Sequence, residues 1–490
     1  MNANLILFFI LGYFGLLMLI ARITSRRAKQ NAYFDGDRSS PWFLVAFGMI
    51  GSGISAVSLV SIPGNVGNNQ LFYFQFILGN IAGYLFIAFI LTPLFHRLKV
   101  ISIYSYLGQR FGATTYKTGS AFFMVSQSFG AAFRLLLSVK ILQTAFFDGY
   151  HIPYYVTVLI VLGLIWLYTH QSGVKTIVWT DALQSFFLLS VIIISIFTIL
   201  NALDLSLPGL FRSLRDNPHA QVFDWNWHGG SNFFKQFISG MLITVALVGL
   251  DQSMMQKTLT IHSAAGARKN VLTFSFFIAF AQTLFLGLGI LLYLYVEQKG
   301  ISIPMKDGVY TQTDALYPFL TQTYFGKIGA ITFFIGVVAS TFATIDSCIT
   351  ALTTAFSYDF LKLDQQPEAK RKALKNRVLL VVNLVIFAIV MGFWNSQGAI
   401  INTIFTIAGY TYGPLLGLYL LGLFSQVSLR DKWVPLACLA APVLTWFLNK
   451  WLVESFNFDP GFFIIGVNAA VTIILLLLIK AQRHAGKISH

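Results

Sequence analysis

The sequence is poor in charge and almost without cysteine. Only 10% of its 490 residues are Asp, Glu, Lys or Arg, and its two cysteines are Cys348 and Cys438. Because both lie in apolar segments, we expect neither a disulfide framework nor a cysteine-rich metal site. A GxxxxGK[ST] phosphate-binding loop is absent from the sequence, which argues against an ATP-driven motor. A long linker is also missing, so we treat residues 1–490 as one domain.

Apolar residues take the place of the missing charge. The chain is 56% hydrophobic and 16% aromatic, with a mean hydropathy of +0.71. A soluble protein of this length could not bury so much apolar surface, and apolar runs of about 20 residues recur from end to end. The first run, LILFFILGYFGLLMLIA, leads into a basic stretch without a cleavage site, so we expect an uncleaved span. The sequence therefore predicts an all-α polytopic membrane protein.

The basic residues indicate the topology of this protein in the bilayer. We expect about thirteen transmembrane helices, near 3–22, 42–63, 72–96, 118–146, 153–170, 176–201, 232–256, 271–296, 328–359, 378–394, 398–424, 433–453 and 461–479. Most of the 33 Lys and Arg residues fall in one alternate set of loops and tails. The positive-inside rule makes that side cytoplasmic. We therefore expect a protein of the cell membrane with its N-terminus outside the cell and its C-terminus in the cytoplasm. The net charge of +15 thus reflects topology and gives no reason to expect a nucleic-acid partner.

The number of spans suggests an internal repeat. A leader helix and inner loop (1–41) would precede two groups of five spans, 42–201 and 232–424. Peripheral helices and a cytoplasmic tail (433–490) would follow them. Five is an odd number, so the second group would enter the membrane from the opposite side. Inverted repeats of this kind place a binding site at the midplane, where helices break.

The stretch GMIGSGISAVSLVSIPG, residues 48–64, is a poor helix in an apolar span. Each glycine costs a helix interior roughly 1 kcal/mol. One interpretation is close helix packing through small residues. The other is a discontinuous helix whose freed carbonyls coordinate a cation while Ser55 and Ser58 face a substrate. In that interpretation Pro63 and Gly64 end the helix.

Hydroxyl groups and carboxylates also lie within spans. In ASTFATIDSCITALTTAFSYDF, Ser340, Thr344 and Ser347 share one helical face, and Asp346 lies beside them. Hydroxyls in membrane helices commonly bond back to their own helix, but an intramembrane carboxylate suggests a functional site. A second acid, Asp181, follows Lys175 in GVKTIVWTDALQSFF. It could instead be a charge at a helix N-terminus, stabilised by the helix dipole.

Taken together, these segments resemble the sodium/solute symporter family. The matching pieces are the broken helix ending in SIPG, then RLKVISIYSYLGQRFG, GVKTIVWTDALQ and GLDQSMMQKTLT, and last the hydroxyl helix that runs into FSYDF. They occur in the family's order and cover most of the chain. The resemblance implies a leucine-transporter-like fold of five plus five helices with a leader helix. It also implies alternating access driven by sodium.

Cation sites can be carried over from the family by position. The common sodium site would use the carbonyl oxygens of two residues in the broken helix and three residues of the hydroxyl helix: Gly51, Ile54, Ser340, Ala343 and Thr344. The family usually has two adjacent hydroxyls where this chain has Ala343-Thr344, so one side-chain ligand is missing. A second site of some members would correspond to Asp181, Asp346 and Ser347. Sodium prefers oxygen ligands, so neither site requires His or Cys.

The substrate site is predicted from charges and polar groups near the membrane midplane. Arg134 is too central in its span to reach water, whereas Lys140 can extend to the interface. Arg134 resembles the arginine that binds the substrate carboxylate in sialic acid carriers, and a guanidinium suits a carboxylate bidentately. An internal ion pair with Asp181 or Asp346 is the alternative. Phe76 and Asn80 would complete the pocket with Ser55 and Ser58.

The predicted function is sodium-coupled import of a small organic solute. The sixth core helix reads ALVGLDQ where sugar carriers have aromatic residues, so an organic anion or sugar-like acid is favoured over a neutral hexose. Alternatives are a neutral sugar or amino acid as substrate, a solute sensor without transport, a channel, and a membrane-embedded enzyme. We expect sodium as the coupling ion, no organic cofactor, and a monomer.

Overall fold

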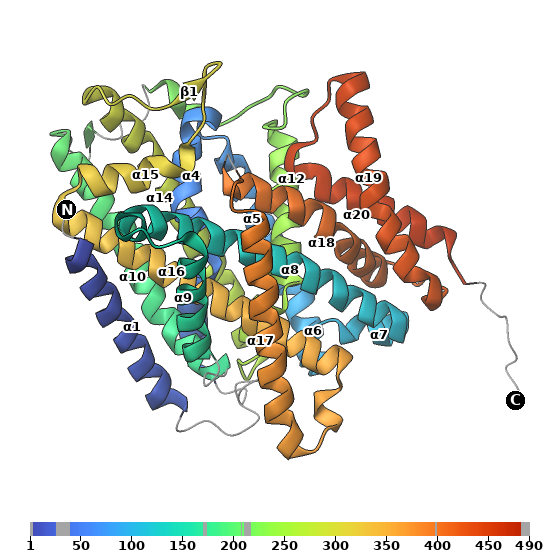
Figure 1. Cartoon of the computed structure of the whole chain (residues 1–490). Coiled ribbons are helices and arrows are strands. Elements are labelled where there is room, and N and C mark those ends of the chain that lie inside the picture. The colour runs from blue at the N-terminus through green and yellow to red at the C-terminus, as the bar shows by residue number, and fades with distance from the viewer. Residues whose placement is uncertain are drawn as a thin grey trace, which may run out of the picture.

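The computed structural model describes residues 3–25, 40–169, 174–206, 208–209, 217–396 and 399–481. The described chain is nearly all helical (Figure 1). Its first half contains the helices α1 (Ala3–Ser25), α3 (Trp42–Gly53), α4 (Ala56–Asn69), α5 (Tyr73–Phe86), α6 (Thr92–Leu98), α7 (Ser105–Arg110), α8 (Ala113–Leu142), α9 (Tyr154–Thr169) and α10 (Val174–Ala202). Short π turns extend α5 and α8, at Ile87–Leu91 and Gln143–Phe147.

The second half has a similar helical content. Its helices are α12 (Phe233–Thr244) with the π turn η6 (Val245–Gly249), α13 (Gln252–Thr258), α14 (Ala264–Gln298), α15 (Thr313–Thr323), α16 (Gly326–Ala355) with the π turn η7 (Phe356–Phe360), α17 (Glu368–Gly392), α18 (Ile400–Phe424), α19 (Val434–Phe456) and α20 (Ile464–Leu478). A two-stranded hairpin, β1 (Met305–Lys306) and β2 (Val309–Tyr310), precedes α15. Helices α19 and α20 lie together at one edge of the bundle, next to α18 (Figure 1).

The membrane-spanning helices follow the predicted pattern closely. Among the described residues, ten helices are long and apolar enough to cross a membrane, or up to twelve if each of two bent helix pairs is one span. The shorter apolar helix Tyr154–Leu167 occupies the predicted span 153–170. The count of thirteen therefore stays a prediction. Helix α17 begins at Glu368, well before the predicted span 378–394, so the basic residues that lie between the predicted spans 328–359 and 378–394 are in part helical.

The first bent pair confirms that the glycine-rich span is broken. Helices α3 and α4 meet at 58°, and the residues between them, Ile54 and Ser55, have extended backbones. The expectation that Pro63 and Gly64 end the helix was wrong, because α4 continues to Asn69. Tertiary contacts hold this part of α4 in place: the Gly64 carbonyl accepts a hydrogen bond from the Tyr293 hydroxyl at 2.7 Å. A proline inside a helix removes one backbone donor and crowds the preceding turn, yet α4 passes through Pro63 where Tyr293 binds the next residue.

A second break was not predicted from the sequence. Helix α12 with its π turn meets α13 at 67°. The Asp251 side chain caps the new helix by accepting a hydrogen bond from the Ser253 amide at 2.7 Å, a common arrangement at helix starts. The two breaks thus lie in the first helix of each predicted repeat, as inverted-repeat transporters have them. The repeat boundaries at 42–201 and 232–424 stay predictions.

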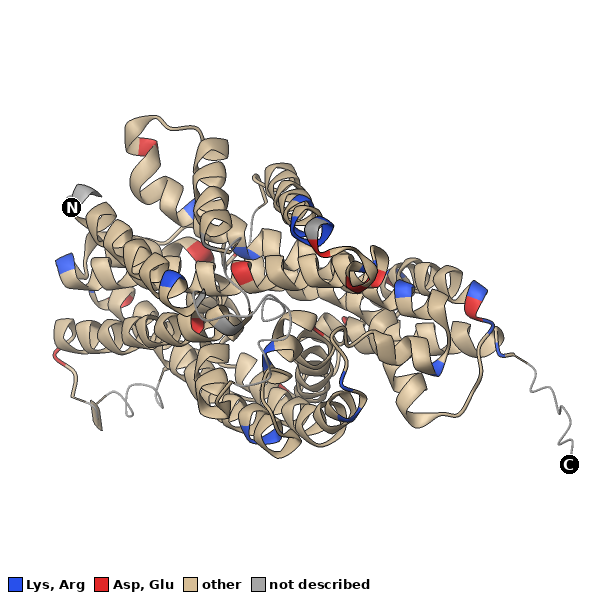
Figure 2. Cartoon of the chain, turned by 90° about the horizontal axis from the view of Figure 1, so that it is seen from below, with Lys and Arg blue, Asp and Glu red and all other residues tan. Residues whose placement is uncertain are grey.

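Glycines allow the two halves to approach closely. A Cβ atom on Gly79 would lie 2.0 Å from the Phe237 carbonyl oxygen, and one on Gly240 would lie 2.2 Å from that of Phe76. Helices α5 and α12 therefore touch backbone to backbone, as small residues permit in membrane proteins. Seen from below, Lys and Arg positions are spread over helix ends and loops (Figure 2). In Figure 1 this face is the lower one, where α1 ends and α17 begins.

Candidate functional site

A cavity of about 110 Å³ lies between the two helix breaks. Ser52 and Gly53 line it from the first break, and Asp251 and Ser253 line it from the second. The structure also brings together in its wall all five residues that the sequence predicted for the substrate: Ser55, Ser58, Phe76, Asn80 and Arg134. They come from α4, α5 and α8 and from the residue before α4, so the fold collects them from separate spans.

One end of this cavity is aromatic. The Phe76 ring stacks on Tyr73 with centroids 5.0 Å apart and contacts Phe405 of α18 at 5.2 Å. Tyr73 and Phe405 also line a smaller cavity of about 40 Å³ on α4 and α5. These rings therefore separate two hollow regions of the protein, and a ligand that passes between them must displace aromatic side chains.

Arg134 is the cationic group of the cavity. Its Nη1 atom lies 3.9 Å from the Cys348 sulfur. In the part of the chain that the structure describes, Arg134 forms no ion pair with a carboxylate. The alternative of a pair with Asp181 is not what the structure has, because Asp181 binds Lys257 instead. The guanidinium thus borders the cavity without a bound carboxylate of the protein.

Two polar residues near Arg134 were missed by the sequence reasoning. Gln127 donates through Nε2 to Ser253 Oγ and to the Cys348 sulfur, both at 3.2 Å. Asp251 accepts a hydrogen bond from the Tyr412 hydroxyl at 2.9 Å. Gln127 precedes Arg134 by seven residues, two helical turns, so the shared face of α8 was a usable signal. Nothing local in the sequence indicates that Asp251 begins a new helix beside it.

Asn80 is anchored at the side of the cavity. Its side-chain amide lies 3.0 Å from the Thr244 hydroxyl and 3.3 Å from the Gln282 side-chain oxygen. These partners come from α12 and α14, so the amide connects three helices. The protein therefore uses part of the hydrogen-bonding capacity of Asn80, and the rest can serve a ligand.

The residues predicted for the common sodium site lie at the end of α3 and on α16, two helices that contact each other. The last carbonyl groups of a helix have no partner within it, and Gly51 lies in this last turn while Ile54 follows it. On α16, Thr344 Oγ1 donates to the Ser340 carbonyl at 2.6 Å, and Ser340 Oγ donates to that of Val337 at 3.0 Å. Both hydroxyl oxygens keep a lone pair for a cation, since each donates its only proton to its own helix.

Ala343 and Ser185 complete the surroundings of this first position. The Ala343 carbonyl accepts a hydrogen bond from Ser347 Oγ at 2.7 Å. Ser185 of α10 binds α3 directly: its hydroxyl lies 2.6 Å from the Phe47 carbonyl oxygen and accepts from the Gly51 amide at 2.7 Å. A Cβ atom on Gly51 would lie 2.8 Å from this hydroxyl. Gly51 is thus needed here for close approach of α10.

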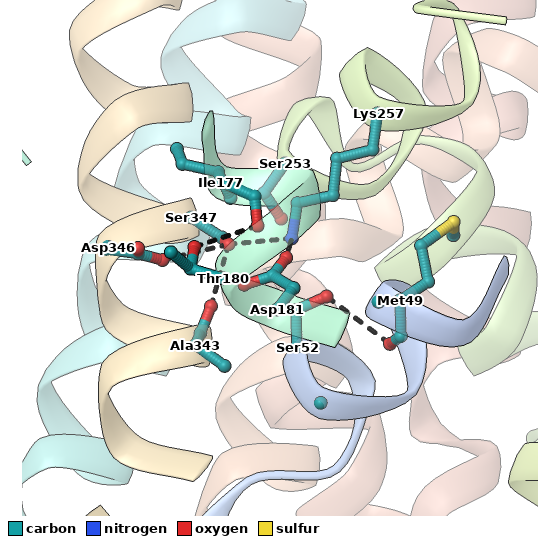
Figure 3. Close-up of polar contacts among 12 residues, drawn as sticks. Met49, Ser52, Ile177, Thr180, Asp181, Ser253, Lys257, Ala343, Asp346 and Ser347 are labelled. Atoms are coloured by element: carbon teal, nitrogen blue, oxygen red, sulfur yellow. Dashed lines mark hydrogen bonds and ion pairs between the residues drawn. The ribbon is translucent and has the colours of Figure 1, made fainter. Parts of the chain in front are cut away.

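The second predicted cation position contains a lysine. The Lys257 ammonium lies 2.5 Å from Asp181 Oδ2 and donates to Ser347 Oγ at 2.7 Å, and Ser347 lies 3.1 Å from Asp346 Oδ1 (Figure 3). All three predicted residues are therefore gathered around one point. The sequence reasoning missed Lys257 because it follows directly after the predicted span 232–256. Its place within GLDQSMMQKTLT, at the membrane end of a core helix, was the available signal.

Three of the family-like segments meet near the second break. Gln252 holds the loop between α6 and α7 with two hydrogen bonds, from Ile103 N at 3.1 Å and to the Ile101 carbonyl at 2.7 Å. In the same loop Tyr104 donates to the Leu250 carbonyl at 3.0 Å, and Ser102 donates to Asp359 at 3.0 Å. These contacts fasten the loop between α6 and α7 to the start of α13 and to η7.

A helical bundle in which two broken helices enclose a polar cavity is the architecture of a secondary transporter. The family model "Sodium:solute symporter family" matches residues 33–428. The chain therefore belongs to the sodium:solute symporter family, as the sequence motifs indicated. That family consists of transporters, which leaves the membrane-enzyme alternative without support.

Similar curated proteins include two bacterial carriers. The sodium/sialic acid symporter SiaT of Proteus mirabilis (strain HI4320) is 23% identical, over 97% of this chain and 94% of its own length. The sodium/sialic acid symporter NanT of Aliivibrio fischeri (strain ATCC 700601 / ES114) is 22% identical, over 95% and 90%. The human sodium/iodide cotransporter is 23% identical, over 84% of this chain and 63% of its own.

Solved structures confirm the fold. A Na+-coupled sialic acid symporter in its substrate-bound, outward-open state matches with a TM-score of 0.80 at 18% identity, over 96% of this chain and 97% of that one. Mhp1, a nucleobase-cation-symport-1 family transporter, matches with a TM-score of 0.54 at 14% identity, over 91% and 93%. The predicted leucine-transporter-like fold is thus present.

Proposed function

We propose that this protein is a sodium-coupled symporter that imports a small organic anion by alternating access. The observation that carries the proposal is Arg134, whose guanidinium borders the cavity between the two helix breaks and forms no ion pair among the described residues. Asp251 borders the same cavity, but its carboxylate accepts hydrogen bonds from Ser253 and Tyr412. Burying such a charge is unfavourable unless a counter-charge meets it. An anionic substrate would supply that charge during each transport cycle.

The coupling ion is sodium, bound at the end of α3. Its ligands are the carbonyl oxygens of Gly51 and Ile54 with Ala343 and the hydroxyls of Ser340 and Thr344, and no organic cofactor takes part. Each sodium that enters down 100 mV contributes about 2.3 kcal/mol. For a neutral substrate that energy supports roughly a 45-fold concentration ratio. A monovalent anion that enters with a single sodium cancels the voltage contribution, so the sodium concentration gradient then drives its uptake. The N-terminus lies outside and the C-terminus in the cytoplasm, and the protein works as a monomer.

The relatives named above suggest the substrate class. Two of them are sodium/sialic acid symporters, and sialic acid combines a carboxylate with hydroxyl and amide groups. Ser55, Ser58 and Asn80 offer matching hydrogen-bond partners in the same cavity as Arg134. A sugar-like carboxylic acid therefore fits better than a neutral sugar or an amino acid.

Uptake into proteoliposomes tests this function. Purified protein is reconstituted and given an inward sodium gradient with radiolabelled N-acetylneuraminate, lactate, glucose or proline. We expect sodium-dependent uptake of one of the two acids and little of glucose or proline. Equally fast uptake when choline or potassium replaces sodium would contradict sodium symport. Binding without uptake would favour the sensor alternative instead.

Substitution of Arg134 tests the role of the anion. Arg134→Lys should lower uptake about 100-fold, because an ammonium cannot form the bidentate contact of a guanidinium. Sodium-induced thermal stabilisation should persist, since the proposed sodium ligands lie on other helices. Arg268→Lys is the matched control, because Arg268 lies exposed over the Phe89 ring of the protein exterior. Recovery of poor expression by an added Asp346→Asn would instead identify an internal ion pair.

A further inference from the structure

The position predicted for a second sodium ion is held by a cation of the protein itself. Lys257 and Asp181 are 3% and 0% exposed, and the ammonium lies 2.5 Å from the carboxylate. It also donates to Ser347, a second predicted ligand, at 2.7 Å. Figure 3 shows the ammonium reaching from α13 between Asp181 of α10 and Ser347 of α16.

We propose that the Lys257 ammonium acts as a tethered cation in place of a second sodium ion, so that each transport cycle carries one sodium. The proposal rests on the proposed function, sodium symport. Two carboxylates border this position: Lys257 binds and neutralises Asp181, and Asp346 accepts a hydrogen bond from Ser347, the other partner of the ammonium. A sodium ion added to the same oxygens would stand beside an ammonium in a medium of low dielectric, where like charges repel strongly.

The position of Lys257 on a fixed short helix supports this inference. Lys257 lies on α13, the short helix that follows the second break, and its carbonyl oxygen accepts hydrogen bonds from Thr260 Oγ1 at 2.7 Å and Thr260 N at 3.1 Å. These contacts fix the last turn of α13, and so the position of the Lys257 backbone from which the ammonium extends. A sodium ion would be released at the end of a cycle, whereas the ammonium stays with the protein.

The consequence is a change in the charge moved per cycle. One sodium and one monovalent anion together carry no net charge, and the Lys257–Asp181 pair is itself neutral. Transport of a monocarboxylate should therefore be insensitive to membrane voltage. With two sodium ions the same cycle would move one positive charge inward and would be driven by a negative interior.

The test compares sodium and voltage dependence in four forms of the full-length protein. These are the wild type, Lys257→Arg, Lys257→Met, and Lys257→Met with Asp181→Asn. Uptake of whichever acid of the panel is transported is measured against sodium concentration, with the voltage set by potassium and valinomycin. Wild type and Lys257→Arg should show a Hill slope near one and no response to voltage.

The neutral variants separate the outcomes. Lys257→Met leaves Asp181 bare, so sodium should enter the vacated position, raise the Hill slope toward two and make uptake voltage-driven. The double variant removes the carboxylate as well and should return to a slope near one. A wild-type slope near two with voltage-driven uptake would overturn the proposal, and so would a Lys257→Met variant that keeps a slope of one.

Sodium alone provides a readout that does not need transport. In detergent, Lys257→Met should be less stable than wild type in potassium and should recover its melting temperature as sodium is added. If Asp181→Asn restores the stability of Lys257→Met but sodium does not, sodium cannot replace the ammonium and the proposal fails. Absence of any sodium dependence in wild-type uptake would instead refute the proposed symport, a result distinct from all of these.

Discussion

The two predicted cation positions adjoin the same helix, α10, but differ in the charged groups that the protein places there. Ser185 and Asp181 are one turn apart on α10. Ser185 binds the Gly51 amide beside the first position, and Asp181 binds the Lys257 ammonium at the second. The first position offers neutral oxygens from a broken helix and needs a cation from outside. The second already contains an ion pair, which is satisfied only while both partners remain.

This difference explains which position suits an exchangeable ion. Carbonyl and hydroxyl oxygens can bind sodium and release it without leaving a bare charge inside the protein. A buried carboxylate without its partner is strongly unfavourable, so a cation there is best held permanently. The following three predictions concern the first position and would separate it from the second.

The largest effect is expected from Gly51→Ala. The new Cβ atom would meet Ser185 Oγ at 2.8 Å and the Asp181 carbonyl oxygen at 2.9 Å. Because these belong to α10, the substitution must push α10 from α3, and a shift of about 1 Å can lower a rate by about 100-fold. Uptake at equal protein content should fall at least that far. Gly287→Ala is the control, since its Cβ would have no neighbour within 4 Å.

A smaller effect is expected from Thr344→Ala. The substitution removes the remaining hydroxyl at the pair where Ala343 already lacks one. The sodium concentration for half-maximal uptake should rise about tenfold, equivalent to about 1.4 kcal/mol, while the Hill slope stays unchanged. Thr332→Ala serves as control, because Thr332 lies on α16 and also bonds back to its own helix. An unaltered sodium dependence in Thr344→Ala would remove this residue from the site.

The smallest effect is expected from Ser185→Ala. Its hydroxyl is placed between the Phe47 carbonyl and the Gly51 amide, two groups that can bond each other within a regular helix. The loss of stability should therefore be only about 1 kcal/mol, with sodium affinity changed less than about threefold. Thermal unfolding and sodium titration measure both. Ser190→Ala, on the same helix, is the reference. A collapse of uptake would mean that Ser185 contacts sodium directly.

The sequence predicted features whose free-energy cost depends on the residue itself, and failed where distant contacts decide the structure. Arg134, Asn80 and Ser55 could be selected because polar groups inside a membrane must face protein or water. They do line one cavity. Pro63 misled the prediction of a helix end, because contacts from α14 and α15, remote in sequence, hold α4 in place beyond it.

The sequence by itself determined that the chain crosses a membrane many times, that one span is broken at glycines, and which family it belongs to. Hydrophobicity, helix propensity and ordered motifs are local properties and can be read from neighbouring residues. Only the tertiary structure decided that a second helix breaks at Asp251 and that Lys257 meets Asp181. Lys257 and Asp181 are 76 positions apart. Which charge neutralises which is settled only when separate helices pack together.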